Sequence, residues 1–254
     1  TGGLIEIGSG SVVVSVIVSS ATAAHPDIIW SQREFATTAH TSDADQNLKS
    51  MLMALMNAMM ALDNGGGAAL RAQGLAAQLQ QLQISISAPW AFTISQIIRY
   101  ERDDSFTVTT QLINELVKNA ESKTTEVLAN YKKDDNTSIA IMTRAISSIA
   151  INDYVTMDPV GQTGKKIALT QISAVAQTLL TTAVDDLRKK LYPKLLTERY
   201  STMILYHCIA RELYPSMTEY CLIDLTYEAT ELAIIRDGVL QYTCLLYTSD
   251  AADE

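Results

Sequence analysis

Apolar and polar residues alternate in two stretches that lie near the two ends of the chain. From Leu4 to Val18, the sequence LIEIGSGSVVVSVIV has the pattern of a strand, a turn of small residues and a second strand. From Leu222 to Val239, a similar alternation surrounds a polar turn and leads to Asp237-Gly238, a dipeptide typical of tight hairpins. The sequence therefore predicts two β-hairpins that flank the rest of the chain.

The segment after the first hairpin predicts a strand, a helix and another strand. PDIIWSQREF, residues 26–35, continues the sheet as a third strand. Apolar residues, several of them methionines, then recur at helical spacing from Leu48 to Leu62, which predicts an amphipathic helix with a core-facing stripe. Asn64 to Gly67 is expected to end this helix. Strict alternation over residues 82–86 predicts the next strand.

The pattern changes after Pro89-Trp90, which we interpret as a boundary. The following elements are predicted as a strand at Ile94–Tyr100, a helix at Val108–Ala120, and strands at Ile139–Ile151 and Lys166–Val175. This order, strand-helix-strand-strand, indicates an independent unit inserted into the chain.

Two further helices are predicted between this unit and the second hairpin, at Thr178–Leu196 and Met203–Leu213. The segment from Cys244 to Glu254, CLLYTSDAADE, looks like a sequencing-library adaptor read through as if it were coding. We therefore expect the natural sequence to be visible only to about Thr243 and the protein to be truncated there.

Composition and charge exclude some classes of function. The 254 residues are 48% hydrophobic and can form one or two domains, and 28 acids against 19 bases give a net charge of −9. Binding to a nucleic-acid backbone requires a basic surface, so a nucleic-acid partner is not expected.

No apolar run approaches the length of a bilayer span. The valine-rich run at 12–24 resembles the end of a signal peptide, but it lacks a basic start and follows Glu6. The cysteine pattern is that of a reducing cytoplasm.

Several motifs that would carry enzyme chemistry fail in detail. Residues 161–166, GQTGKK, resemble a phosphate-binding loop but lack its first glycine and its hydroxyl residue. His25, His40 and His207 show no metal-ligand spacing with one another or with the cysteines. No nucleophile elbow is present. Ordinary hydrolase chemistry therefore has no support.

Three motifs in a fixed order carry a family resemblance. They are LIEIGSGSV at residues 4–12, AINDYVTMDPVGQTGKKIAL at 150–169 and IDLTYEATELAIIRDG at 223–238. In this order the chain resembles the bacterial actin-like ATPase superfamily of the FtsA/PilM type, whose members act in cell division and type IV pilus assembly. The resemblance implies an α/β fold: an actin-like, ribonuclease H-like half-domain with an inserted strand-helix-strand-strand subdomain, and the start of a second actin-like half.

The resemblance also implies a division of the chain. We expect the first part of actin-like domain I at 1–90, the inserted subdomain at 91–178, the return helices of domain I at 179–217, the truncated start of domain II at 218–243, and the adaptor-derived tail at 244–254.

In the family, the two hairpins clasp the phosphates of a nucleotide, and acidic residues hold hydrated Mg²⁺. By this resemblance the nucleotide-binding residues are expected to be Gly8, Ser9, Gly10, Ser11, Asp224, Thr226 and Thr230. The small residues of the first turn allow backbone N–H groups to approach phosphate closely. Glu6 and Asp224 are expected to hold Mg²⁺ through water, and no catalytic residue is assigned.

The second hairpin departs from the family pattern. Thr226, Tyr227 and Glu228 stand where the family has three glycines. Tyr227 is expected to crowd the loop, and Glu228 to place a carboxylate near phosphate. We therefore expect weak or lost binding of ATP and Mg²⁺. Whether the chain is an enzyme stays open; if it is active, the resemblance implies an actin-type ATPase.

The function implied by the resemblance is that of a cytoplasmic scaffold at the inner face of the membrane. Its expected partners are membrane-associated pilus or division proteins, with self-association as a further role and no direct membrane contact from the visible chain. The alternative is an actin-fold kinase of a sugar or of acetate. A third alternative is a generic α/β domain, in which the two hairpins would not face one cleft.

Overall fold

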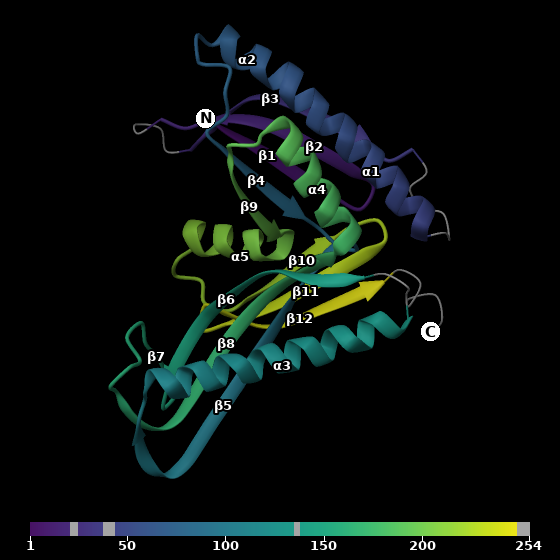
Figure 1. Ribbon diagram of the computed structural model, residues 1–254. Helices are drawn as coiled ribbons and strands as arrows, with labels where there is room; N and C mark the ends of the chain where they lie inside the picture. Colours follow the sequence, from purple (N-terminus) through teal and green to yellow (C-terminus); the bar gives the residue numbers. More distant parts are fainter. Residues whose placement is uncertain (21–24, 38–43, 135–137, 248–254) are drawn as a thin grey trace.

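The computed structural model describes residues 1–20, 25–37, 44–134 and 138–247. Within these ranges the strands form a five-stranded, a four-stranded and a three-stranded sheet. Helices connect the strands and pack on the sheets. Figure 1 shows the five-stranded sheet at one end of the molecule, the four-stranded sheet at the other end, and the three-stranded sheet between them.

The five-stranded sheet contains the first predicted hairpin. Its strands are β1 (Gly2–Ile7), β2 (Ser11–Val18), β3 (Asp27–Phe35), β4 (Gln81–Ile86) and β9 (Leu196–Ser201), in the order β3-β2-β1-β4-β9. β1, β2 and β3 pair antiparallel, whereas β4 runs parallel to β1 and β9 runs parallel to β4. The carboxyl ends of β1, β4 and β9 therefore lie at one edge of the sheet, where α/β proteins place their ligand sites.

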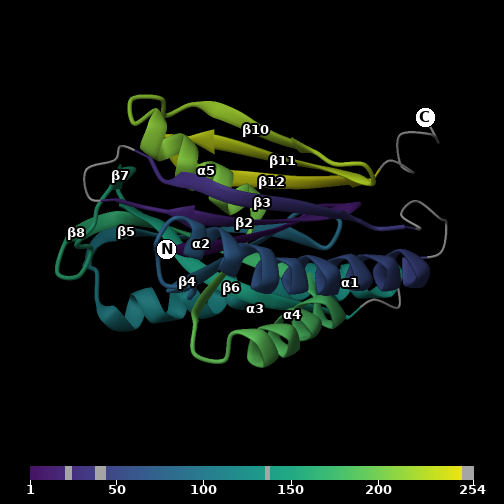
Figure 2. The same cartoon turned by 90° about the horizontal axis from the view of Figure 1, so that it is seen from above.

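Two helices cover one face of this sheet. α1 (Ala44–Ala61) and α4 (Thr178–Leu191) lie on the same side, as Figure 2 shows, and α5 (Thr202–Leu213) lies on the other. Met51 and Met59 of α1 are fully buried in the core with Ile5 and Ile84, whereas the intervening Met56 is exposed. The prediction of a core-facing methionine stripe is therefore confirmed.

The glycine run does not end this helix, contrary to expectation. The chain continues from α1 through one π-helical turn, η1 (Leu62–Gly66), into α2 (Gly67–Ala72). A Cβ atom on Gly65 would lie 2.7 Å from Trp30, and one on Gly66 would lie 2.7 Å from Val16. These glycines therefore allow the helix to approach β2 and β3 closely, and their helix-breaking tendency is overridden by packing.

The four-stranded sheet forms the inserted unit. Its elements are β5 (Ala91–Thr107), α3 (Thr110–Asp134), β6 (Ile139–Ile151), β7 (Tyr154–Val155) and β8 (Thr163–Gln177), with strand order β5-β8-β6-β7. α3 packs along one face of the sheet, and it is longer than predicted. Its buried stripe continues through Thr124, whose hydroxyl donates to the Ala120 carbonyl oxygen at 3.0 Å, and through Leu128. Because Thr124 is polar, it interrupts the apolar pattern, and the second half of the helix was therefore not predicted.

The three-stranded sheet contains the second predicted hairpin. β10 (Tyr220–Leu225), β11 (Ala229–Arg236) and β12 (Val239–Tyr247) pair antiparallel in sequence order. β12 runs beside the inserted unit, where the Thr243 hydroxyl donates to the carbonyl oxygen of Thr93 at 2.7 Å. Residues 244–247 of the expected adaptor-derived tail continue β12, and residues 248–254 lie outside the described residues. The origin of this tail stays a prediction.

Strand β9 corrects the predicted helix at Thr178–Leu196. α4 ends at Leu191, and residues 196–201 instead pair with β4 as the fifth strand of the first sheet. The Tyr192-Pro193 step separates the two, because proline disfavours helical geometry in the residue before it. The strand itself, LTERYS, carries too few apolar residues to be recognised by alternation.

Candidate functional site

The turns of the two predicted hairpins meet at one cavity. The β1–β2 turn and the β10–β11 turn both line a space of about 480 Å³. The turns also touch directly, since the backbone N–H of Tyr227 donates to Ser9 Oγ at 3.0 Å. Residues that are far apart in the sequence are therefore joined into a single site.

The first hairpin turn is tight and is anchored from outside. The N–H of Gly8 donates to the carbonyl oxygen of Ser11 at 2.9 Å, which leaves Ser9 and Gly10 as the turn residues. The indole N–H of Trp90 donates to the Gly8 carbonyl oxygen at 2.9 Å. Trp90 stands just before the inserted unit, so this bond ties the position of the turn to the start of β5.

The second hairpin turn carries two bulky residues that point to different places. Thr226 closes the turn, because its N–H and its hydroxyl both donate to the Ala229 carbonyl oxygen, at 3.0 and 2.7 Å. Tyr227 lines the cavity, as expected. Glu228 is not among the residues that line it, and its carboxylate accepts a hydrogen bond from Asn47 of α1 at 3.3 Å. The structure therefore places Tyr227 at the cavity and gives Glu228 a different partner from the one expected, whereas the crowding by Tyr227 stays a prediction.

Two carboxylates that interact electrostatically line the cavity. Glu6 of β1 and Asp224 of β10 both line it. Burial raises the pKa of Asp224, the negative charge of Glu6 raises it further, and a hydrogen bond from Ser87 opposes the rise. Asp224 Oδ2 is buried and has no hydrogen-bond partner within the described residues. A cation between the two carboxylates would relieve both effects.

These carboxylates fit a hydrated Mg²⁺ ion better than a dedicated metal cage. Mg²⁺ keeps several waters and is commonly held by one or two carboxylates. Within the described ranges, no three His, Cys, Asp or Glu side chains gather in a metal-ligating group. The residues present would therefore hold Mg²⁺ through its water, as expected for Glu6 and Asp224.

A polyphosphate fits the same cavity less well. Arg33 of β3 is the only basic residue among those described as lining the cavity, and it donates to Ser11 Oγ at 2.8 Å. The Tyr227 N–H, which could face phosphate, is already bonded to Ser9. A phosphate chain between the turns would require the turns to separate and to exchange this bond.

The structure brings together most of the residues that the sequence nominated. Glu6, Gly8, Ser9, Gly10, Ser11, Asp224 and Thr226 all line the cavity. Thr230 does not; it lies on β11 opposite Leu225 and is not among the lining residues. Arg33, Ser87 and Tyr206 line the cavity and were not nominated. Ser87 follows β4 directly, and its position at the carboxyl end of a parallel strand was a usable signal.

Glu231 forms a buried polar contact beside the cavity. It pairs with Asp224 across β10 and β11 and is only 1% exposed. Its Oε1 accepts the N–H of Thr93 at 2.7 Å, and its Oε2 has no hydrogen-bond partner within the described residues. Burial raises the pKa of Glu231 from 4.5 to about 7. This carboxyl group therefore links the second hairpin to the first strand of the inserted unit.

Comparison with solved structures shows the fold of the chain. The sequence matches no family model and no curated protein. Among solved structures, a protein with actin-like ATPase fold and unknown function from Bacteroides thetaiotaomicron matches 98% of this chain with a TM-score of 0.51 at 9% identity. The chain has an actin-like ATPase fold. A chain of the PilM-PilN type IV pilus biogenesis complex matches 96% of it with a TM-score of 0.50 at 12% identity.

The likeness to these two structures is one of fold alone. This chain spans 60% of the matched chain of the PilM-PilN complex and 72% of the Bacteroides protein. The actin-like fold, with both hairpins at one cavity, excludes the generic α/β domain as an explanation of the sequence pattern.

Proposed function

We propose that this protein is an actin-fold scaffold that docks membrane-associated pilus-assembly or cell-division proteins, and that it binds ATP and Mg²⁺ weakly. The observation that carries the proposal is the direct bond between the two hairpins, from the Tyr227 N–H to Ser9 Oγ. This bond joins the two turns that, by the family resemblance, are expected to clasp phosphate. A protein built in this way is suited to binding partners rather than to turning over nucleotide.

The inserted unit supports a docking role. At its end, the side chains of Tyr154, Val155, Met157 and Val160 are exposed, and Met157 is 93% exposed. Figure 1 places this segment, around β7, at the far end of the molecule from α1. Exposed apolar groups gathered in one short segment are typical of interaction surfaces.

The proposed location is the cytoplasm, at the inner face of the membrane. The structural likeness to a chain of the PilM-PilN type IV pilus biogenesis complex supports a pilus-type partner, with self-association as a second role. Among the described residues, no helix combines the length and apolar character of a membrane span. The net charge of −9 favours contact through a protein rather than through anionic lipid, and disfavours nucleic acid.

Docking is tested with fluorescent peptides that represent the cytoplasmic segments of membrane-associated pilus and division proteins. We expect one such peptide to bind with a micromolar Kd and to lose binding when Met157 and Tyr154 are both replaced by aspartate. Ile28→Asp, at an exposed apolar residue of β3, is the matched control. The kinase alternative would instead show transfer of the γ-phosphate of MgATP to a sugar or to acetate with no peptide bound, and this result would contradict the scaffold.

Arg33 gives a separate prediction for the phosphate site. Arg33→Gln is expected to weaken binding of magnesium triphosphate about fivefold, because one exposed charge-assisted contact is lost. Inorganic triphosphate is the probe because it requires only the two hairpins. Isothermal titration calorimetry measures the change, with Arg102→Gln on the inserted unit as the control. Equal affinities of wild type and Arg33→Gln would remove Arg33 from the site.

A further inference from the structure

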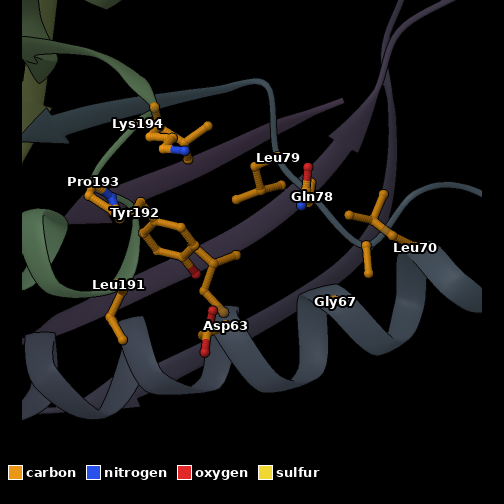
Figure 3. A pocket seen from close by; sticks show the side chains of 12 residues that line it. Asp63, Gly67, Leu70, Gln78, Leu79, Leu191, Tyr192, Pro193 and Lys194 are labelled. Atoms are coloured by element: carbon orange, nitrogen blue, oxygen red, sulfur yellow. The ribbon is translucent and has the colours of Figure 1, made fainter.

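A second cavity lies in the five-stranded-sheet part of the molecule and shares no lining residue with the hairpin cavity. Its volume is about 290 Å³, and it opens between the η1–α2 segment and the loop that joins α4 to β9 (Figure 3). It is therefore a distinct candidate site, whatever the hairpin cavity binds.

This cavity is called the Tyr192 pocket below. Leucine side chains form its apolar floor. Leu62 and Leu70 are buried, and Leu79, Leu191 and Leu195 are partly buried around them. Small-molecule sites are concave and mainly apolar, with a few polar groups that fix the orientation of the ligand. The polar groups of this pocket thus determine which ligand it suits.

The hydroxyl of Tyr192 is the first of these polar groups. Its oxygen is buried and has no hydrogen-bond partner within the described residues. Burial raises the pKa of Tyr192, and the neighbouring Asp63 carboxylate raises it further. A buried hydroxyl group without a partner is destabilising, so a ligand that bonds to it gains what the free protein lacks.

The charged groups of the pocket lie on either side of Tyr192. Figure 3 shows Lys194 on one side of the Tyr192 ring and Asp63 on the other, with the hydroxyl directed toward Asp63. Within the described residues, neither Asp63 nor Lys194 forms a salt bridge. Both side chains are exposed at the rim and can meet a ligand that enters from solvent.

The position of Asp63 is fixed by the fold. Asp63 belongs to the π-helical turn η1, and the next glycines of this turn pack against Trp30 and Val16 without room for a Cβ atom. Such wide helical turns occur frequently at functional sites. The carboxylate is therefore presented on a rigid segment beside the unpartnered hydroxyl.

We propose that the Tyr192 pocket binds a small amphipathic amine. The ammonium group donates hydrogen bonds to the Asp63 carboxylate and to the Tyr192 hydroxyl oxygen, and the hydrocarbon body lies against Leu62, Leu70 and Leu79. An anion at the same point would be repelled by Asp63, which excludes the opposite choice of charge. Lys194 repels the ammonium group from the other end, and this sets the direction in which the ligand lies.

The test compares hexylamine, hexanol and hexanoate, which share one hydrocarbon body. Binding to the whole chain is followed by ligand-observed NMR at millimolar concentration, the range expected for such small ligands. We expect hexylamine to bind and hexanol to bind roughly tenfold more weakly, because a charge-assisted hydrogen bond is lost. Hexanoate should bind more weakly than hexanol, because Asp63 repels its carboxylate. Equal binding of hexylamine and hexanol would show an apolar cavity only and would overturn the proposal, as would the absence of hexylamine binding.

Two variants assign the binding to this pocket. Asp63→Asn should weaken hexylamine roughly tenfold, whereas Asp186→Asn, at an exposed carboxylate of α4, should leave its affinity unchanged. Tyr192→Phe should weaken hexylamine while raising the melting temperature of the free protein, because the unpartnered hydroxyl is removed. If Tyr192 had only a structural role, its replacement would not both weaken hexylamine binding and raise the melting temperature. Unchanged hexylamine affinity in Asp63→Asn would overturn the assignment.

Discussion

Replacing Tyr227 by glycine is expected to strengthen binding of magnesium triphosphate roughly tenfold, a gain equivalent to about one good hydrogen bond to an anion. Tyr227 lines the cavity at the turn that contacts Ser9, and we expect its side chain to limit how closely that turn can approach phosphate. Glycine removes this bulk and permits backbone conformations in which N–H groups approach phosphate closely. Isothermal titration calorimetry with inorganic triphosphate and Mg²⁺ measures the difference in Kd.

Glu228→Gly provides the matched control for this prediction. Glu228 also stands where the family has glycine, but its carboxylate bonds to Asn47 of α1 and does not line the cavity. Its removal should leave triphosphate affinity close to that of the wild type and should loosen the contact between the turn and α1. If Glu228→Gly and Tyr227→Gly strengthened binding equally, the different placement of the two side chains would be contradicted.

Replacing Glu231 by glutamine is expected to stabilise the protein by roughly 2 kcal/mol at pH 8. Burial raises the pKa of Glu231 from 4.5 to about 7 in the folded chain, a difference that corresponds to roughly 3 kcal/mol of folding free energy. Between these two pH values, the folded state holds a proton that the unfolded state has lost. The contribution of Glu231 to stability is therefore greatest below pH 4.5 and is lost as the pH rises to about 7.

Glutamine keeps an acceptor for the Thr93 N–H and cannot ionise. The stability difference between Glu231→Gln and wild type should therefore be small near pH 4.5 and should grow until the pH reaches about 7. Urea unfolding across this range measures it. Glu126→Gln, at an exposed glutamate of α3, should follow the wild type at every pH. Parallel pH profiles of Glu231→Gln and wild type would contradict this assignment.

The hairpins and most strands were predictable because their signals are local. Period-two alternation and small turn residues defined both hairpins, and the structure contains them at Gly2–Val18 and Tyr220–Arg236. The local sequence pattern gave a wrong prediction where tertiary packing overrode the helix propensity of the residues. The glycines at 65–67 predict a helix end in sequence, but the close packing of Gly65 against Trp30 and of Gly66 against Val16 exists only in the folded chain.

The candidate site was predictable in part for the same reason. Gly8 to Ser11 and Asp224 could be nominated from turn chemistry and family pattern, and they lie together. The bond between Ser9 and Tyr227 depends on how two distant hairpins meet, which no local pattern encodes. The direction of Glu228 depends on α1, and the pairing of Glu231 with the Thr93 N–H depends on the inserted unit.

The contact between the two hairpins is tested most directly by disulfide cross-linking. Ser9→Cys and Tyr227→Cys are combined in a chain whose Cys208, Cys221 and Cys244 have been replaced by serine. Because the Tyr227 N atom lies 3.0 Å from Ser9 Oγ, we expect the two cysteines to form a disulfide under mild oxidation. Ser9→Cys with Thr230→Cys should not cross-link, since Thr230 does not line the cavity. Failure of the first pair to cross-link, or equal cross-linking of both pairs, would contradict the direct contact between the two hairpin turns.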